Sequence, residues 1–146
     1  MIKSERVVGS CFGSISHIIH YRGGQQLKKL GITSQQGRLL WLIYDSMRAE
    51  HVINRQYLEK IMDLRGPTVT SLLNSLEEKG YILRTVCKED HRAMQLIITP
   101  SGEDMVYNIK EIFDRMDARL LRGMTDEEIQ TLRTLLFKVY DNLLIP

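Results

Sequence analysis

The sequence has few cysteines and no long apolar segment, and each shortage excludes a class of protein. Only Cys11 and Cys87 occur among the 146 residues, so a disulfide-stabilised secreted fold is excluded and both thiols are expected to be reduced. No apolar run reaches the ~18 residues that a membrane-spanning helix needs, and residues 1–14 lack the apolar core of a signal peptide. We therefore expect a soluble, cytoplasmic protein.

The sequence also lacks a large excess of charge. Its 20 lysines and arginines face 18 aspartates and glutamates, a net charge of +2, which is unlike a polybasic nucleic-acid-binding protein. The charges are nevertheless unevenly placed: residues 1–48 carry seven basic and two acidic side chains, residues 103–128 four and eight, and residues 54–99 seven and six. Binding to nucleic acid would therefore depend on a few placed cations and not on net charge.

Motifs for catalysis and metal binding are absent as well. The chain has no phosphate-binding loop, no HExxH helix, no nucleophile elbow and no Cys/His zinc pattern. His17 and His20 share a helix face and are the candidate pair for a metal ion. We predict a protein that is not an enzyme and that holds neither a cofactor nor a metal.

What the sequence does contain is a set of helix-start signals along one domain-sized chain. Capping boxes occur at Thr33–Gln36 and Thr125–Glu128, and Thr99 is placed to cap a helix that begins at Pro100. The predicted helices cover residues 5–30, 34 through the apolar run at 39–44, 100–121, and 126 onward. A kink or break is expected at Gly23–Gly24, because glycine weakens a helix by about 1 kcal/mol relative to alanine.

Residues 54–99 carry the most informative pattern. A short helix capped by Asn54, a turn over residues 63–66 and a second helix over 67–79 form a candidate helix-turn-helix. The short helix is expected to bury an apolar face made of Tyr57, Leu58, Ile61 and Met62. Two β-prone runs, 81–87 and 93–99, flank a charged tip and predict a hairpin. The expected fold is therefore mainly α with a small β-hairpin wing.

The second helix of this motif divides into two faces. At about 100° per residue, one face carries Val69, Leu72, Leu73 and Leu76, and the other carries Pro67, Thr70, Ser71, Asn74 and Ser75, with Thr68 flanking. Short polar side chains of this kind can meet base edges or phosphates, and an asparagine amide can pair with adenine. An ordinary solvated helix face is the alternative, and the helix-turn-helix context favours DNA.

The tip of the hairpin adds a second candidate contact. Arg92 is placed to enter a minor groove, where the negative potential favours a guanidinium group. Arg84, Lys88 and Arg55 could neutralise phosphates around it. The alternative is a wing tip that charge merely keeps soluble, with Asp90 and Arg92 paired to each other.

These residues carry a resemblance to a known family. Leu76–Gly80 reads L-E-E-K-G, Asp90–Arg92 reads D-H-R and Ile98–Gly102 reads I-T-P-S-G. Together with Leu30–Thr33, which precedes the second helix, these motifs resemble the MarR family of bacterial transcription regulators. The order of the predicted elements fits that family over essentially the whole chain.

The resemblance implies a sequence-specific DNA-binding regulator, a repressor, that binds a palindromic operator as a homodimer. Residues 1–32 and 103–146 would form a helical dimerisation region, and residues 33–102 the winged helix-turn-helix lobe. A stripe in the last helix favours the same dimer independently, because a small chain offers few surfaces on which to bury it. This stripe consists of Ile129, Leu132, Leu136, Val139 and Leu143.

The resemblance also assigns DNA contacts. Arg92 corresponds to the minor-groove residue and Asp90 helps to hold the wing, while the recognition-helix positions fall on Thr68, Thr70, Ser71 and Asn74. The family often carries arginine or lysine where Ser71 and Ser75 stand here. Phosphate contacts are therefore expected to depend more on the wing and on Arg38, Arg55 and Arg65.

Regulation is a further expectation. Many relatives bind small aromatic or lipophilic effectors between the dimerisation helices and the lobe. The candidate lining here is His17, His20, Tyr21, Arg22, Trp41 and Tyr44, and core packing or solvation is the alternative for each. Cys11 lies roughly where a peroxide-sensing branch keeps its reactive cysteine, and a buried, inert thiol is the alternative. The zinc-sensing branch also uses histidines on a helix that corresponds to residues 103–121, which contain none.

A second class of function stays open. A winged helix can contact a protein partner instead of DNA, and a steep dependence of binding on salt would separate the two.

Overall fold

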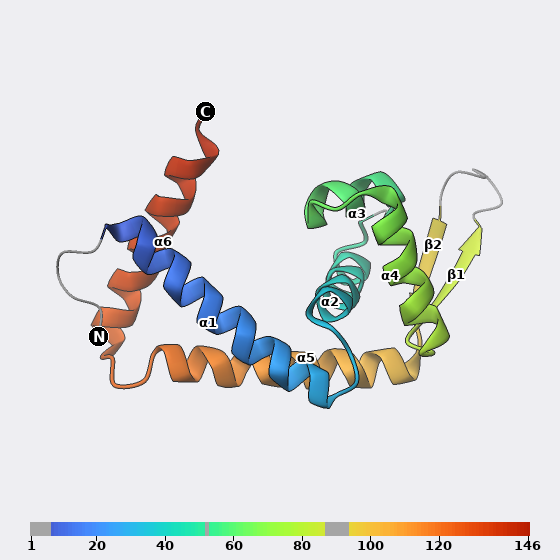
Figure 1. Cartoon of the computed structure of the whole chain (residues 1–146), viewed down its shortest axis with the longest axis horizontal. Coiled ribbons are helices and arrows are strands. Elements are labelled where there is room, and N and C mark those ends of the chain that lie inside the picture. Colours follow the sequence, from blue (N-terminus) through green and yellow to red (C-terminus); the bar gives the residue numbers. More distant parts are fainter. Residues whose placement is uncertain (1–6, 52, 87–93) are drawn as a thin grey trace. The chain divides into compact units, whose positions relative to one another are not determined.

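The computed structural model describes residues 7–51, 53–86 and 94–146, and the chain forms two compact units that divide after Phe113. Its elements, in order, are α1 (Val8–Lys29), α2 (Ser34–Arg48), α3 (Arg55–Met62), α4 (Gly66–Glu78), β1 (Ile82–Val86), β2 (Met94–Ile98), α5 (Pro100–Leu120) and α6 (Asp126–Leu144) (Figure 1). The predicted mainly helical fold with an antiparallel two-stranded wing is confirmed. Within the described ranges, no helix combines the length and the apolar character of a membrane span.

Local signals begin and end the helices where the sequence predicts. Thr33 and Thr125 each complete a capping box at the start of α2 and α6. Asn54 accepts a hydrogen bond from the first turn of α3. After α4, Gly80 adopts a φ of 78°, the left-handed conformation that glycine favours at a helix end.

The core of the first unit is centred on α2. Leu39, Leu40 and Ile43 have no exposed surface, which confirms that the apolar run at 39–44 is the buried centre. The same cluster contains side chains from the other elements of the unit, among them Leu58, Leu73, Leu76, Ile82 and Ile109. Full burial of each such side chain is worth about 1.5–3 kcal/mol, so this cluster holds α4 and the wing in place.

Two local predictions are wrong. The first helix is unbroken through Gly23–Gly24, and Gly24 has a packing role there, because a Cβ on it would lie 3.0 Å from the Ser34 hydroxyl at the start of α2. Ile61 is 39% exposed instead of buried. The core meets only one face of the short α3, and Leu58 and Met62, four residues apart, occupy that face.

Backbone contacts join the wing to α5. Thr99 accepts a bond from Gly102 N at 3.0 Å, which caps the helix as predicted, and its hydroxyl donates to the Gly80 carbonyl. Thr99 N donates to the Tyr81 carbonyl at 3.1 Å. Gly102 is buried against that same carbonyl oxygen, which a Cβ would overlap. The I-T-P-S-G motif therefore forms a close-packed joint between β2 and α5.

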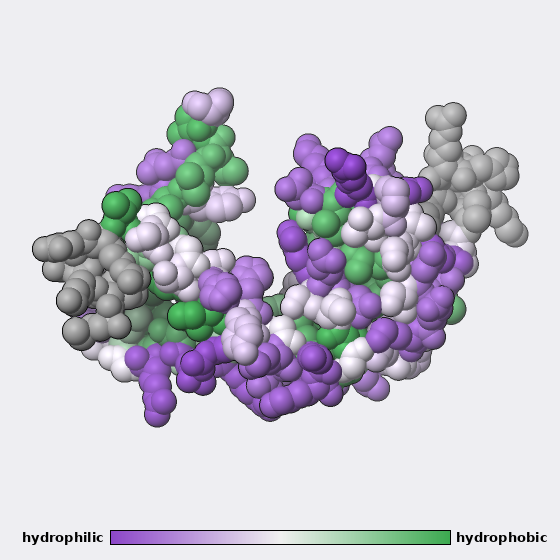
Figure 2. Space-filling model, in the orientation of Figure 1, coloured by the Kyte–Doolittle hydropathy of each residue, from purple (hydrophilic) through white to green (hydrophobic). Residues whose placement is uncertain are grey.

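The second unit contains the end of α5 and α6. No residue of α6 is buried, although this helix carries the predicted apolar stripe. Leu136 is 43% exposed and Leu143 is 80% exposed, and Figure 2 shows apolar side chains at the surface along α6. Ile129, Leu132 and Val139 are half-buried, so a single chain covers the stripe only in part.

Candidate nucleic-acid interface

The outward face of α4 is polar and carries no cation. Its four predicted core residues, Val69, Leu72, Leu73 and Leu76, are all buried. On the other side Thr68, Ser71 and Asn74 are exposed and Thr70 is half-buried. Because residues 66–78 include no lysine or arginine, α4 offers a partner hydroxyl and amide groups, with the exposed carboxylate of Glu78 near its end, and no positive charge.

Ser75 lies at the edge of this face, where α4 meets α2. It is half-buried, and its hydroxyl accepts a hydrogen bond of 2.8 Å from Gln36 Nε2 on α2. Position 75 lies 39 residues from that partner in the sequence, so helical periodicity alone could not show the contact. Ser75 serves the packing of α4 against α2 in this structure.

Three arginines surround the two helices of the motif. Arg65 is the exposed N-cap residue of α4, whose first turn holds no acidic side chain, and the positive end of a helix beside a guanidinium suits a phosphate. Arg55 Nε lies 3.9 Å from Glu59 Oε1 on the next turn of α3. Arg38 reaches from α2 and donates to the Ile61 carbonyl at 3.0 Å. Arg38 is thus held against α3, whereas Arg55 is paired within α3.

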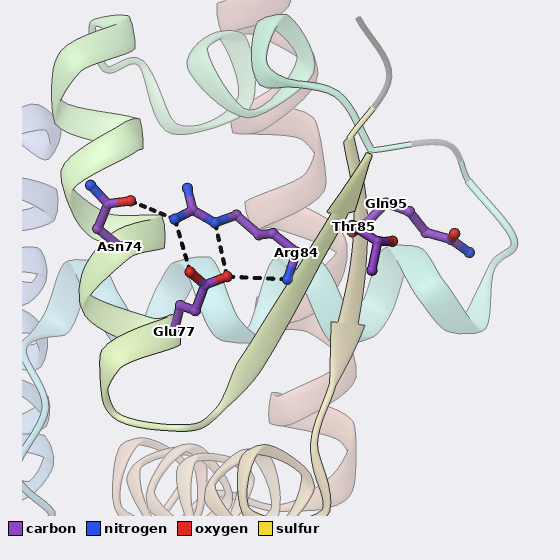
Figure 3. A network of polar contacts seen from close by, with 5 residues as sticks. All are labelled: Asn74, Glu77, Arg84, Thr85 and Gln95. Carbon is purple, nitrogen blue, oxygen red and sulfur yellow. Dashed lines mark hydrogen bonds and ion pairs between the residues drawn. The ribbon is translucent and has the colours of Figure 1, made fainter. Parts of the chain in front are cut away.

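A polar network ties the base of the wing to α4 (Figure 3). Arg84 on β1 donates from Nε to Glu77 Oε2 and from Nη2 to Glu77 Oε1, both at 3.1 Å, and its backbone N–H reaches Oε2 at 3.2 Å. Nη2 also donates to Asn74 Oδ1 at 2.6 Å. The network therefore connects two turns of α4 to the first strand of the wing.

This network reduces the net positive charge that Arg84 can present to a binding partner. The hydrogen bonds with Arg84 hold the pKa of Glu77 below its ordinary value of 4.5, and the same bonds raise the pKa of Arg84. The pair stays ionised at neutral pH, and the carboxylate offsets the guanidinium charge. Sequence reasoning missed Glu77, because its partner lies seven residues away in another element.

Glu77→Gln is expected to lower stability in a pH-dependent way. A depressed folded-state pKa means that the ionised carboxylate stabilises the folded protein fully above pH 4.5, and that this advantage disappears as the pH falls through the folded pKa. Urea unfolding of the wild type and the variant from pH 7 to pH 3 measures it. Glu78→Gln, the matched loss of one exposed charge, should not reproduce this pattern, and equal pH profiles for Glu77→Gln and Glu78→Gln would contradict it.

The tip of the wing lies beyond the residues that the structure describes. The ladder pairs Ile82 with Ile98 at one end and Val86 with Met94 at the other. Lys88, Asp90 and Arg92 fall between these strands, outside the described residues. Their contacts with DNA stay predictions.

Two of the candidate effector residues belong to an aromatic cluster on α2 and α5. The Trp41 ring lies 6.2 Å from Tyr44 and 6.4 Å from Phe113, the latter edge-on. Arg48 lies over the Tyr44 ring, 5.7 Å from its centre. A hydrogen bond with Tyr44 is the main cause of the raised pKa of Tyr107. Sequence reasoning missed Phe113 and Tyr107, which this fold brings to α2.

The candidate effector residues on α1 do not belong to this aromatic cluster. His17, His20 and Tyr21 are exposed. His20 Nδ1 lies 2.8 Å from the Ser16 carbonyl, and the Tyr21 hydroxyl accepts a hydrogen bond from Gln25, so both side chains have partners within α1. Cys11 is a half-buried free thiol in the first turns of the helix. Among the described residues, no group of three or more His, Cys, Asp or Glu side chains could hold a metal ion.

Known proteins resemble this chain in sequence and in fold. A model of the MarR family matches residues 30–93, which include α2, α3, α4 and β1. A complex of S. aureus MepR with DNA is 30% identical in sequence, covers 97% of this chain and 99% of its own, and superposes with a TM-score of 0.78.

Two further structures of the same relative are similar. MepR, described as a transcription regulator of the Staphylococcus aureus multidrug efflux pump MepA, is 29% identical over 94% of this chain and 99% of its own, with a TM-score of 0.78. MepR bound to ethidium bromide is 30% identical over 97% of this chain and 99% of its own, with a TM-score of 0.63. The similarity thus extends from α1 to α6.

Proposed function

Because this chain belongs to the MarR family of transcription regulators, we propose that it is a homodimeric repressor that binds a palindromic operator and is released by a small aromatic or lipophilic effector. Family membership itself makes it a DNA-binding regulator with a winged helix-turn-helix, and not an enzyme. The observation that carries the finer proposal is the similarity, over nearly the whole chain, to a relative in complex with DNA.

The dimer is proposed from the exposed apolar side chains of α6, among them Leu136 and Leu143. Residues 1–32 and 103–146 form the dimerisation region in this proposal, and residues 33–102 form the DNA-binding lobe. A row of exposed apolar side chains is typical of an interaction surface. A second copy of the chain offers the same apolar surface as a partner. A two-fold dimer would present two copies of α4 about one turn of DNA apart.

The DNA contacts divide into base and backbone contacts. The outward face of α4 enters the major groove with Thr68, Thr70, Ser71 and Asn74. Arg55, Arg65 and Lys88 meet phosphates, Arg92 enters the minor groove, and Asp90 holds the wing. Because its partner is chromosomal DNA, the protein acts in the bacterial cytoplasm.

Selection of bound duplexes from a random pool tests this function. We expect a palindrome whose half-sites lie about one helical turn apart, and an affinity that falls steeply with salt, by about 0.9 in the log–log slope for each phosphate contact. If the pool yields no preferred duplex and binding responds weakly to salt, α4 serves a protein partner and the proposal fails.

Arg92→Ala is expected to weaken operator binding at least about tenfold at moderate salt, because the guanidinium would leave the narrow, electronegative minor groove. Fluorescence anisotropy with the selected duplex measures the loss. Arg122→Ala removes the same charge from the loop between α5 and α6 and should leave the affinity within about twofold. Equal affinities of the wild type and Arg92→Ala would remove the wing from the mechanism.

The effector site is proposed at the aromatic cluster. Half-buried aromatic rings stack well on planar ligands, and the relative MepR has been seen with the planar aromatic cation ethidium. The half-buried rings of Trp41 and Tyr44 stand next to the cationic Arg48. An aromatic carboxylate would find both stacking and a counter-charge there.

Trp41 supplies a direct readout, because it is the single tryptophan of the chain. Benzoate, added without DNA, is expected to quench its fluorescence saturably, and Tyr44→Ala should weaken that binding about tenfold. An effector coupled to DNA release would lower operator affinity by roughly 5- to 150-fold. Tyr21→Ala, the same change on α1, should leave quenching unchanged. Equal losses of ligand affinity in Tyr44→Ala and Tyr21→Ala would indicate a site nearer α1. The absence of any quenching would refute the proposed site.

A further inference from the structure

The orientation of the Asn74 amide is set by chemistry. Asn74 is exposed on α4, and its Oδ1 accepts a hydrogen bond of 2.6 Å from Arg84 Nη2. A guanidinium has only donors, so the group that faces it must be the carbonyl oxygen and not the NH₂. Figure 3 shows the consequence: the amide oxygen points toward Arg84 and the amide nitrogen points away from it.

Arg84 is itself fixed in place, so breaking its hydrogen bond to the Asn74 oxygen would cost free energy. Two side-chain bonds and one backbone bond fix it to Glu77, and the two side chains are only 26% and 37% exposed. Turning the Asn74 amide over would place its NH₂ against the guanidinium, two donors face to face, and would forfeit a charge-assisted bond. The amide is therefore preorganised as a donor toward any partner of α4.

A donor-only amide distinguishes between purines. Adenine presents an acceptor, N7, beside a donor, N6, and pairs with asparagine only when both the oxygen and the nitrogen of the amide face its edge. A carbonyl oxygen has two lone pairs, but that of Asn74 points toward the wing and not along the NH₂ direction. Guanine presents two acceptors, N7 and O6, and both suit an NH₂ group. The adenine N6 donor would instead face the amide donor.

We propose that Asn74 is a specificity-determining residue that reads guanine in preference to adenine in the major groove, because Arg84 and Glu77 commit its carbonyl oxygen to the wing. This inference rests on the proposed function, in which α4 enters the major groove. It replaces the expectation from sequence alone that the amide pairs with adenine.

Random-pool selections with the full-length wild type, Asn74→Ala and Asn74→Asp test the inference. The wild type should prefer guanine over adenine by at least about fivefold at one position of each half-site, and Asn74→Ala should lose that preference. Asn74→Asp keeps an acceptor for Arg84 and has no donor, so the same position should change from guanine to cytosine, whose N4 donates.

Arg84→Met removes the group that orients the amide. The freed amide should then accept adenine at that position, raising its share toward that of guanine. Lys60→Met, the matched loss of one positive charge on α3, should leave the base preference as in the wild type. Melting curves of each variant check that it is folded. If Arg84→Met does not fold, Asn74→Asp still decides the test.

The outcomes separate this inference from the function on which it rests. A wild type that selects a specific palindrome with adenine at the position dependent on Asn74, or with no such position, would overturn the inference and leave the repressor intact. A wild type that selects no duplex would overturn the proposed function and the inference together. Guanine at that position, with cytosine for Asn74→Asp, would establish it.

Discussion

Leu136→Asp is expected to convert the proposed dimer into monomers and to lower operator affinity by roughly a hundredfold or more, because two half-sites would no longer be bound as one unit. Leu136 lies on the apolar stripe of α6, is 43% exposed in the single chain and does not belong to the buried core, so its replacement leaves that core intact. A buried, unpaired carboxylate would oppose assembly of the two copies. Analytical ultracentrifugation and anisotropy with the selected duplex measure the two effects.

Gln130→Asp is the matched control for this prediction. It places the same carboxylate on an exposed position of the same helix, outside the apolar stripe, and should leave a dimer with nearly unchanged affinity. Circular dichroism shows whether the helices persist in both variants. If Leu136→Asp remains dimeric at micromolar concentration, α6 does not form the dimer interface.

The second large effect is expected from Gly102→Ala, which should destabilise the protein by about 2–3 kcal/mol. Overpacking of a filled site costs about 1–3 kcal/mol, and here the added methyl group would overlap a backbone oxygen of Tyr81 and lie 2.9 Å from Ile98 Cγ2. Backbone cannot move aside as a flexible side chain can. Since β2 and α5 meet at this joint, the strain would act directly on the wing.

Denaturant unfolding at a fixed protomer concentration measures this loss as a lower midpoint. Gly23→Ala is the control, because a Cβ there has no neighbouring atom within 4 Å. In the middle of α1 that change should be neutral or should stabilise the helix by up to about 1 kcal/mol. A midpoint for Gly102→Ala equal to that of the wild type would show that the joint relaxes freely.

The features that sequence reasoning predicted correctly depend on residues close together in the chain. A capping box joins positions three apart, as at Thr33 and Gln36. The buried face of α4 follows from the helical period, which places Val69, Leu72 and Leu76 on one side. A prediction that also depended on which neighbouring element covers a helix face was wrong at Ile61.

The candidate site shows the same division. Its location on α4 and the wing was predicted, because a helix, a turn, a second helix and a hairpin are each written in local patterns. The hydrogen bonds that join Asn74 and Glu77 to Arg84 were not predicted. Neither was the approach of Phe113 to Trp41, which joins residues 72 positions apart.

The sequence by itself therefore determined that the charge balance of 20 against 18 excludes a polybasic protein, and it also determined the order of the helices and the polar face of α4. Each of these depends on composition or on periodicity within a single element. Only the tertiary structure decided which polar groups remain available on that face. Hydrogen bonds between α4 and β1 occupy the oxygen of Asn74 and offset the charge of Arg84, and such bonds depend on distances that exist only once the elements have packed.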